Sequence, residues 1–129
     1  MTQRPAPDTD GNYGRLQAID LNTKKTLWTT RQHAPMTTAV LATAGGLIFA
    51  GSYDREFAAF NEQTGERLWR VPLASLPSAS PITYAANGKQ YIAVMSGDPS
   101  LGSASIGATV ADILTPKSGG SQVTVFEVP

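Results

Sequence analysis

The fold is decided by a phrase that the chain carries twice, as Ala18-Ile-Asp20-Leu-Asn-Thr23-Lys-Lys-Thr-Leu-Trp28 and as Ala59-Phe-Asn61-Glu-Gln-Thr64-Gly65-Glu-Arg-Leu-Trp69. The two tryptophans are 41 residues apart, and each phrase begins in a short β-rich run. A period of about 40–45 residues built from short strands is typical of β-propeller blades. We therefore predict an all-β chain that forms part of a propeller.

The polar positions of the phrase suit a tight turn after a strand. The side chain of Asp20 or Asn61 can accept backbone N–H bonds there, and the hydroxyl of Thr23 or Thr64 can bond the same turn. These residues are therefore predicted to shape the turn.

The end of the phrase suits a contact between blades. Gly65 permits a turn without a Cβ, whereas Lys24 holds that place in the first copy, so we expect the first turn to be looser or strained. Trp28 and Trp69 each present a flat apolar face and one N–H donor. We expect each indole to lie against the glycine turn of a neighbouring blade, with stacking on a ligand as the lesser alternative.

Composition excludes several classes of function. The chain has 129 residues with ten basic and ten acidic side chains, so no basic field is available for nucleic acid. It has no cysteine, which excludes disulfides and thiolate metal sites. The first twelve residues lack the apolar core of a signal peptide, and no apolar stretch approaches the roughly 20 residues of a membrane helix.

Short strands separated by turns are expected throughout, with no significant helix. Asn87-Gly88 between two β-rich runs predicts a hairpin. We expect a flexible tail at 1–13 and a partial propeller of about two four-stranded blades at 14–129. Its predicted strands are 16–20, 27–31, 37–43, 47–50, 56–61, 67–71, 81–84, 90–95 and 122–128.

The repeat extends beyond the phrase and divides the chain into blade-like units near 14–32, 36–72 and 80–129. Residues 57–61 match both 16–20 and 123–127, and residues 46–50 match 89–93. A Ser/Gly/Ala-rich loop at 97–120 interrupts the last unit, as a decorated blade loop or as a cover over a ligand. Asp8, Asp10 and Asn12 fail the pattern of a calcium loop, so no metal site is predicted.

Four segments together resemble the quinoprotein dehydrogenases, eight-bladed propellers that bind pyrroloquinoline quinone (PQQ), usually with calcium. The repeated phrase resembles their tryptophan-docking motif. The other three are residues 41–51 (LATAGGLIFAG), 81–94 (PITYAANGKQYIAV) and 119–129 (GGSQVTVFEVP). Their order is that of the C-terminal end of the family's large subunit.

The resemblance implies a periplasmic dehydrogenase of alcohols or sugars, with a cytochrome as a possible electron acceptor. The family's calcium ligands and catalytic aspartate match no position here, so no catalytic or metal-binding residue is assigned. Thr37 and Thr38 enter an innermost strand where the methanol-oxidising branch carries a tryptophan stacked on the quinone. Asp98 departs from a glycine-rich family segment. These three are the candidates for facing the cofactor.

Other polar residues have simpler interpretations. Asp98 also suits a solvated loop, Arg55 is better explained as a turn charge than as a substrate clamp, and His33 is only secondarily a proton carrier.

Two hypotheses about function compete, and a third concerns assembly and is compatible with both. The chain is the C-terminal piece of a quinoprotein dehydrogenase, inactive without the missing blades. Alternatively, it is a non-catalytic scaffold or binding module, resembling propeller lipoproteins of outer-membrane assembly. In either case, open sheet edges favour pairing with the remaining blades or with copies of itself.

Overall fold

The computed structural model describes residue 4, residues 6–97, Val110, Asp112, Ile113 and residues 120–129. Every regular element among these residues is a β-strand, which confirms the all-β prediction. The strands are β1 (Gly14–Ile19), β2 (Thr26–Gln32), β3 (Leu41–Ala42), β4 (Leu47–Gly51), β5 (Glu56–Asn61), β6 (Arg67–Pro72), β7 (Leu76–Pro77), β8 (Ile82–Ala86), β9 (Lys89–Gly97) and β10 (Gln122–Val128). No helix in these ranges is long and apolar enough to span a membrane.

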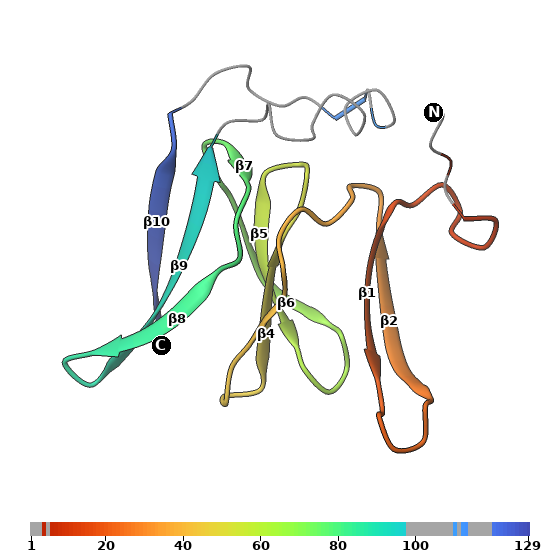
Figure 1. Cartoon of the computed structure of the whole chain (residues 1–129), viewed down its shortest axis with the longest axis horizontal. Coiled ribbons are helices and arrows are strands. Elements are labelled where there is room, and N and C mark those ends of the chain that lie inside the picture. Colours follow the sequence, from red (N-terminus) through yellow and green to blue (C-terminus); the bar gives the residue numbers. More distant parts are fainter. Residues whose placement is uncertain (1–3, 5, 98–109, 111, 114–119) are drawn as a thin grey trace.

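The strands form three antiparallel sheets that lie side by side along the long axis (Figure 1). The first sheet is the β1–β2 hairpin, and the middle sheet has the order β3-β4-β5-β6. In the last sheet, β9 pairs with β10 on one edge and with β8 and β7 on the other. A series of small antiparallel sheets packed face to face is the architecture of propeller blades.

The two copies of the phrase adopt the same local structure. Ala18 pairs with Trp28 and Ala59 with Trp69, and the register shifts directly after each alanine. In the first turn the carboxylate of Asp20 accepts the backbone N–H of Asn22 at 2.7 Å. This repeated irregularity gives both hairpins the same geometry, because a bulge bends and twists the strand that carries it.

The second copy makes the equivalent turn. Asn61 Oδ1 accepts the backbone N–H groups of Gln63 at 2.8 Å and Thr64 at 3.2 Å, and Thr64 Oγ1 accepts that of Glu66 at 3.2 Å. Gly65 has φ of 74° and Lys24, in the same place, has φ of 60°. The lysine therefore occupies a left-handed conformation that costs a residue with a Cβ about 1–2 kcal/mol.

Two apolar interfaces join the sheets. Between the first and middle sheets, Trp28 and Met36 pack against a cluster of Leu16, Ile48, Ala50, Ala58 and Phe60. Between the middle and last sheets, Phe126 packs against a cluster of Phe49, Phe57, Ala59, Leu73, Ile92 and Val94. The core therefore lies between blades, as the alternation of side chains to opposite sheet faces requires.

One predicted alignment within the repeat is wrong by one residue. Residues 46–50 were expected to match 89–93, which equates Ile48 with Tyr91. The sheets instead place Ile48 opposite Phe60 and Ile92 opposite Phe126, so Ile48 corresponds to Ile92. A slip of one residue turns every side chain to the other face, and only the observed register buries Ile92 against the middle sheet.

Strand ends also differ from the prediction. Within 37–43 only Leu41–Ala42 forms regular strand, and Met36 makes a single bridge to Ser52. The short β7 was not predicted because a proline within a run argues against a strand. The hairpin at Asn87-Gly88 is confirmed, with positive φ at both residues, as a type I′ turn requires.

Candidate functional site

Several connections meet at one end of the sheets, which we call the crossover end. It comprises residues 32–40 between the first and middle sheets, the turn at 52–55, and residues 73–80 leading into the last sheet. Tyr53 N donates to Pro35 O at 2.9 Å, and Leu73 N donates to Arg55 O at 2.8 Å. In Figure 1 the crossover end is the edge nearest the N-terminal label, opposite the β1–β2 turn.

The crossover end holds Thr37 and Thr38, which make different contacts. Thr38 Oγ1 accepts the N–H of Gly51 at 2.8 Å and donates to Ala39 O at 2.9 Å, so it fixes the innermost strand to β4. Thr37 Oγ1 is buried and has no hydrogen-bond partner among the described residues. Thr37 therefore keeps a free hydroxyl, and contact of either threonine with a cofactor stays a prediction.

Asp98, the third predicted cofactor-facing residue, lies outside the described residues. So does most of the 97–120 loop, whose two interpretations therefore both remain predictions.

Arg55 ends the turn between β4 and β5. Its φ is 66°, and its N–H donates to Ser52 O at 3.1 Å. Its Nε is buried without a hydrogen-bond partner in the described part of the chain. The backbone contacts of Arg55 fit its interpretation as a turn residue, and its carbonyl also accepts the N–H of Leu73 at 2.8 Å.

His33 makes contacts that the sequence did not reveal. Its Nε2 lies 2.9 and 3.1 Å from the two carboxylate oxygens of Asp112, and its Nδ1 lies 3.4 Å from Gly11 O. The hydrogen bond to Asp112 raises the pKa of His33 and lowers the pKa of Asp112. The two positions are 79 residues apart in sequence, which leaves no local pattern from which this pair could be found.

Two pockets lie on the described surface. One, of about 430 Å³, adjoins the crossover end, and Arg4, Tyr13, Arg15, Pro35 and Met36 are among its lining residues. No acidic side chain lines it.

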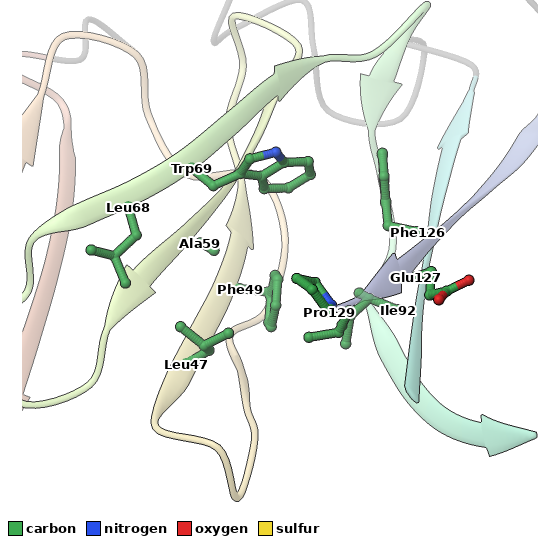
Figure 2. A pocket seen from close by; sticks show the side chains of 10 residues that line it. Leu47, Phe49, Ala59, Leu68, Trp69, Ile92, Phe126, Glu127 and Pro129 are labelled. Atoms are coloured by element: carbon green, nitrogen blue, oxygen red, sulfur yellow. The ribbon is translucent and has the colours of Figure 1, made fainter. Parts of the chain in front are cut away.

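The other pocket, of about 320 Å³, opens between the middle and last sheets (Figure 2). Trp69 and Leu68 lie on one side, while Phe126, Ile92 and Pro129 lie on the other. Among the described residues that line it, Glu127 is the only charged side chain. The pocket is therefore mainly an apolar gap between two sheets.

The two tryptophans differ in how completely they are covered. Trp28 Nε1 donates to Glu62 O at 2.8 Å, and a Cβ built on Gly65 would lie 2.4 Å from Trp28 Cε3. Trp69 lies edge-on to Phe126 at 5.2 Å and keeps 39% of its surface exposed. Trp69 is thus less covered than a docked indole would be, and it lines the apolar pocket between the middle and last sheets.

The described residues do not form a metal site. Among them, no three Asp, Glu, His or Cys side chains lie together as a ligand set. Calcium needs six to eight oxygen ligands, several of them from carboxylates. The described part of the chain therefore offers no calcium site of its own.

Comparisons with known proteins agree with this architecture. Residues 1–92 match the family described as PQQ, glucose/ethanol/alcohol dehydrogenase, beta-propeller domain. The quinoprotein alcohol dehydrogenase PedE of Pseudomonas putida is 36% identical over 121 residues, which is 93% of this chain and 19% of that protein. The chain thus spans about a fifth of the length of this curated relative.

Solved structures give the same result. A europium-containing methanol dehydrogenase superposes with a TM-score of 0.77 at 30% identity, over 92% of this chain and 24% of that one. The quinohemoprotein alcohol dehydrogenase of Comamonas testosteroni superposes with a TM-score of 0.60 at 35% identity, over 64% of this chain and 12% of that one.

Proposed function

Because this chain belongs to the PQQ-dependent glucose/ethanol/alcohol dehydrogenase family of β-propellers, we propose that it supplies the C-terminal blades of a dehydrogenase that oxidises alcohols or sugars. One observation carries the proposal: similarity to an alcohol dehydrogenase extends over 93% of the chain. The chain alone is expected to be inactive, since a PQQ site requires the remaining blades.

When bound in the complete enzyme, PQQ would accept two electrons from the substrate, and calcium would polarise the quinone carbonyl. No three metal-ligating side chains lie together among the described residues, and no step of the reaction is assigned to them. Their proposed role is to hold the inner edge of a blade in place, through the bonds of Thr38 to Gly51 and Ala39. The free hydroxyl of Thr37 is the group that we propose for contact with the cofactor.

The phrase residues act, in this proposal, as the joint between blades. The Trp28 bond to Glu62, together with its contact with Gly65, supports this role. Residues 14–129 then form the propeller part and residues 1–13 an N-terminal extension. A periplasmic location and a cytochrome electron acceptor are proposed from the resemblance to the family.

Self-association is a second candidate, and it would suit a non-catalytic scaffold. The outer face of the last sheet is apolar and exposed. Val125 of β10 and Ile82 of β8 both lie opposite Ala93 of β9, and Val123 lies opposite Met95. Large exposed apolar patches mark interaction sites, so this face is proposed to pack against a missing blade or another copy of the chain.

A chimera tests the main proposal. The segment of Pseudomonas putida PedE that matches this chain would be replaced by residues from this chain, and PQQ-dependent alcohol oxidation would be measured with an artificial electron acceptor. We expect an active chimera and no activity from the isolated chain. The proposal is contradicted if the chimera is folded by circular dichroism but does not bind PQQ, or if the isolated chain alone oxidises alcohols.

A matched variant separates folding from catalysis. A chimera with Gly65→Val should fail to fold, because the new side chain would collide with Trp28. A chimera with Thr37→Val should fold and bind PQQ more weakly. Unchanged PQQ affinity in that variant would remove Thr37 from the cofactor site and leave the proposal for the chain as a whole intact.

A further inference from the structure

Three segments that are distant in sequence meet at His33. Gly11 and Tyr13 come from the residues before and at the start of the first sheet, His33 follows β2, and Asp112 lies in the connection between β9 and β10. The ring of Tyr13 stands edge-on to the imidazole with centroids 6.2 Å apart. The His33 side chain therefore contacts residues of both other segments.

Both ring nitrogens of His33 face hydrogen-bond acceptors. Nε2 faces the carboxylate of Asp112, and Nδ1 faces the carbonyl of Gly11. A neutral imidazole has one N–H donor, whereas the imidazolium has two. Only the protonated ring can therefore donate to both acceptors at once. When the proton is lost, one of the two acceptors faces a ring-nitrogen lone pair instead of an N–H.

An apolar contact lies beside this polar one. Val110 is 1% exposed and packs with Ala34, Tyr53 and Leu76 from the two crossovers and the turn at 52–55. Ile113 packs at the edge of the same cluster beside Tyr13, and its N–H donates to Val110 O at 2.9 Å. The described residues at 110–113 thus rest on the crossover end through one apolar anchor and one ion pair.

We infer that His33 and Asp112 form a pH-operated clasp that fastens Val110, Asp112 and Ile113 to the crossover end. Closed, the clasp joins this part of the β9–β10 connection to Gly11 and Tyr13. Tyr13, whose ring stands edge-on to the imidazole, also lines the 430 Å³ pocket, so the clasp lies beside that pocket.

The direction of the pH dependence follows from the two partners. The pKa of His33 is raised above 6.5, chiefly by its bond to Asp112, so this stabilisation is present below pH 6.5 and is lost as pH rises through the raised value. The pKa of Asp112 is lowered below 3.8 by the same bond, so its contribution is present above that value and is lost in stronger acid. The contact between His33 and its two acceptors is therefore strongest in mildly acidic solution and weakens as pH rises, because a neutral ring can donate to only one of them.

Other charged groups in this region do not form ion pairs with His33 among the described residues. Arg31 pairs with Asp8 at 3.5 Å, and no ion pair among the described residues joins either to His33. Asp10 precedes Gly11, and the phenol of Tyr13 belongs to the ring that packs on the imidazole. Asp8→Asn is consequently a matched control, because it removes a nearby carboxylate without touching the clasp.

The test is an NMR titration of the full chain between about pH 5 and pH 8.5, a range that spans histidine ionisation. His33 is the only histidine, so its ring signals need no assignment. We expect Asp112→Asn to lower the His33 pKa towards about 6.5, and Asp8→Asn to leave it near the wild-type value. The clasp is refuted if Asp112→Asn leaves the His33 pKa unchanged, or if Asp8→Asn lowers it equally.

Amide exchange of Ile113 reports whether the segment itself moves. After correction for the intrinsic pH dependence of exchange, wild-type Ile113 should be protected about two- to fivefold more at low than at high pH, the range that exposed ion pairs give. Asp112→Asn should remove this difference. Equal protection at both pH values in the wild type would show that His33 titrates without holding the segment, and would overturn the inference.

Discussion

The indole of Trp28 lies so close to Gly65 that no other residue fits there: a Cβ on Gly65 would fall 2.4 Å from Cε3 and 2.7 Å from Cδ2 of the ring. The same indole donates to Glu62 O, and Thr30 Oγ1 donates to Gly65 O at 2.8 Å. One hairpin of the first sheet is thereby joined to one turn of the middle sheet by two hydrogen bonds and a close stack.

Gly65→Ala should lower the free energy of unfolding by about 2–4 kcal/mol. The substitution adds a collision with Trp28 to the strain of a φ of 74°. Gly45→Ala is the control, because Gly45 has nothing within 4 Å and should change stability by less than about 1 kcal/mol. Urea unfolding followed by circular dichroism measures both, and equal stability of the two variants would contradict the close stack.

Trp28→Phe should cost more stability than Trp69→Phe. The first variant leaves the carbonyl of Glu62 without its indole donor, at a cost of about 1–2 kcal/mol, and also shortens the stacked face. Trp69 is 39% exposed, and its indole N–H makes no hydrogen bond within the described part of the chain, so its replacement should cost about 0.5–1 kcal/mol. Thermal unfolding of the two variants checks the order; the reverse order would show that Trp69 is the stronger joint.

Lys24→Gly should stabilise the chain by about 0.5–1 kcal/mol. Lys24 has φ of 60°, and glycine adopts this conformation without the penalty of a Cβ. Lys25→Gly is the control at the next position, which has no positive φ, and there glycine should be neutral or destabilising. Both variants lose one positive charge, so charge does not explain a difference between them. We expect the urea midpoint to rise for Lys24→Gly and to stay the same or fall for Lys25→Gly.

Val125→Lys should weaken self-association. Val125 is 48% exposed in the middle of the apolar outer face of the last sheet, where a lysine ammonium would have to be desolvated on contact. Thr29→Lys is a control on the exposed part of β2 in the first sheet. Sedimentation velocity at several concentrations measures the effect. A wild-type chain that stays monomeric throughout would rule out assembly through this face.

Much of the fold could be predicted because the determinants are local. The hydrogen bonds of Asp20 and Asn61 stay within their own turns, and the tryptophan that ends each phrase lies opposite the alanine that begins it. The strand positions followed from the same local signals. The exceptions were β3, which is too short to show alternation, and β7, which contains a proline.

The candidate site was less accessible from sequence. Thr37 and Thr38 are adjacent and chemically identical. Only the tertiary structure shows that the Thr38 hydroxyl accepts the N–H of Gly51, while the Thr37 hydroxyl has no partner among the described residues. Asp112 had no recognisable motif, because its partner is 79 residues away. Arg55 has a positive φ in the turn at 52–55, and its carbonyl accepts the N–H of Leu73, a contact between distant segments that the sequence does not reveal.

The sequence by itself determined the all-β class, the repeating unit and the family, since these rest on turn chemistry and on side-chain alternation that act within a few residues. Tertiary structure alone decided that Ile48 corresponds to Ile92 rather than Tyr91, because the register of a strand is set by the face that its neighbours bury. It also decided the meeting of His33 with Asp112, since contacts between separate connections depend on how the packed sheets bring their ends together.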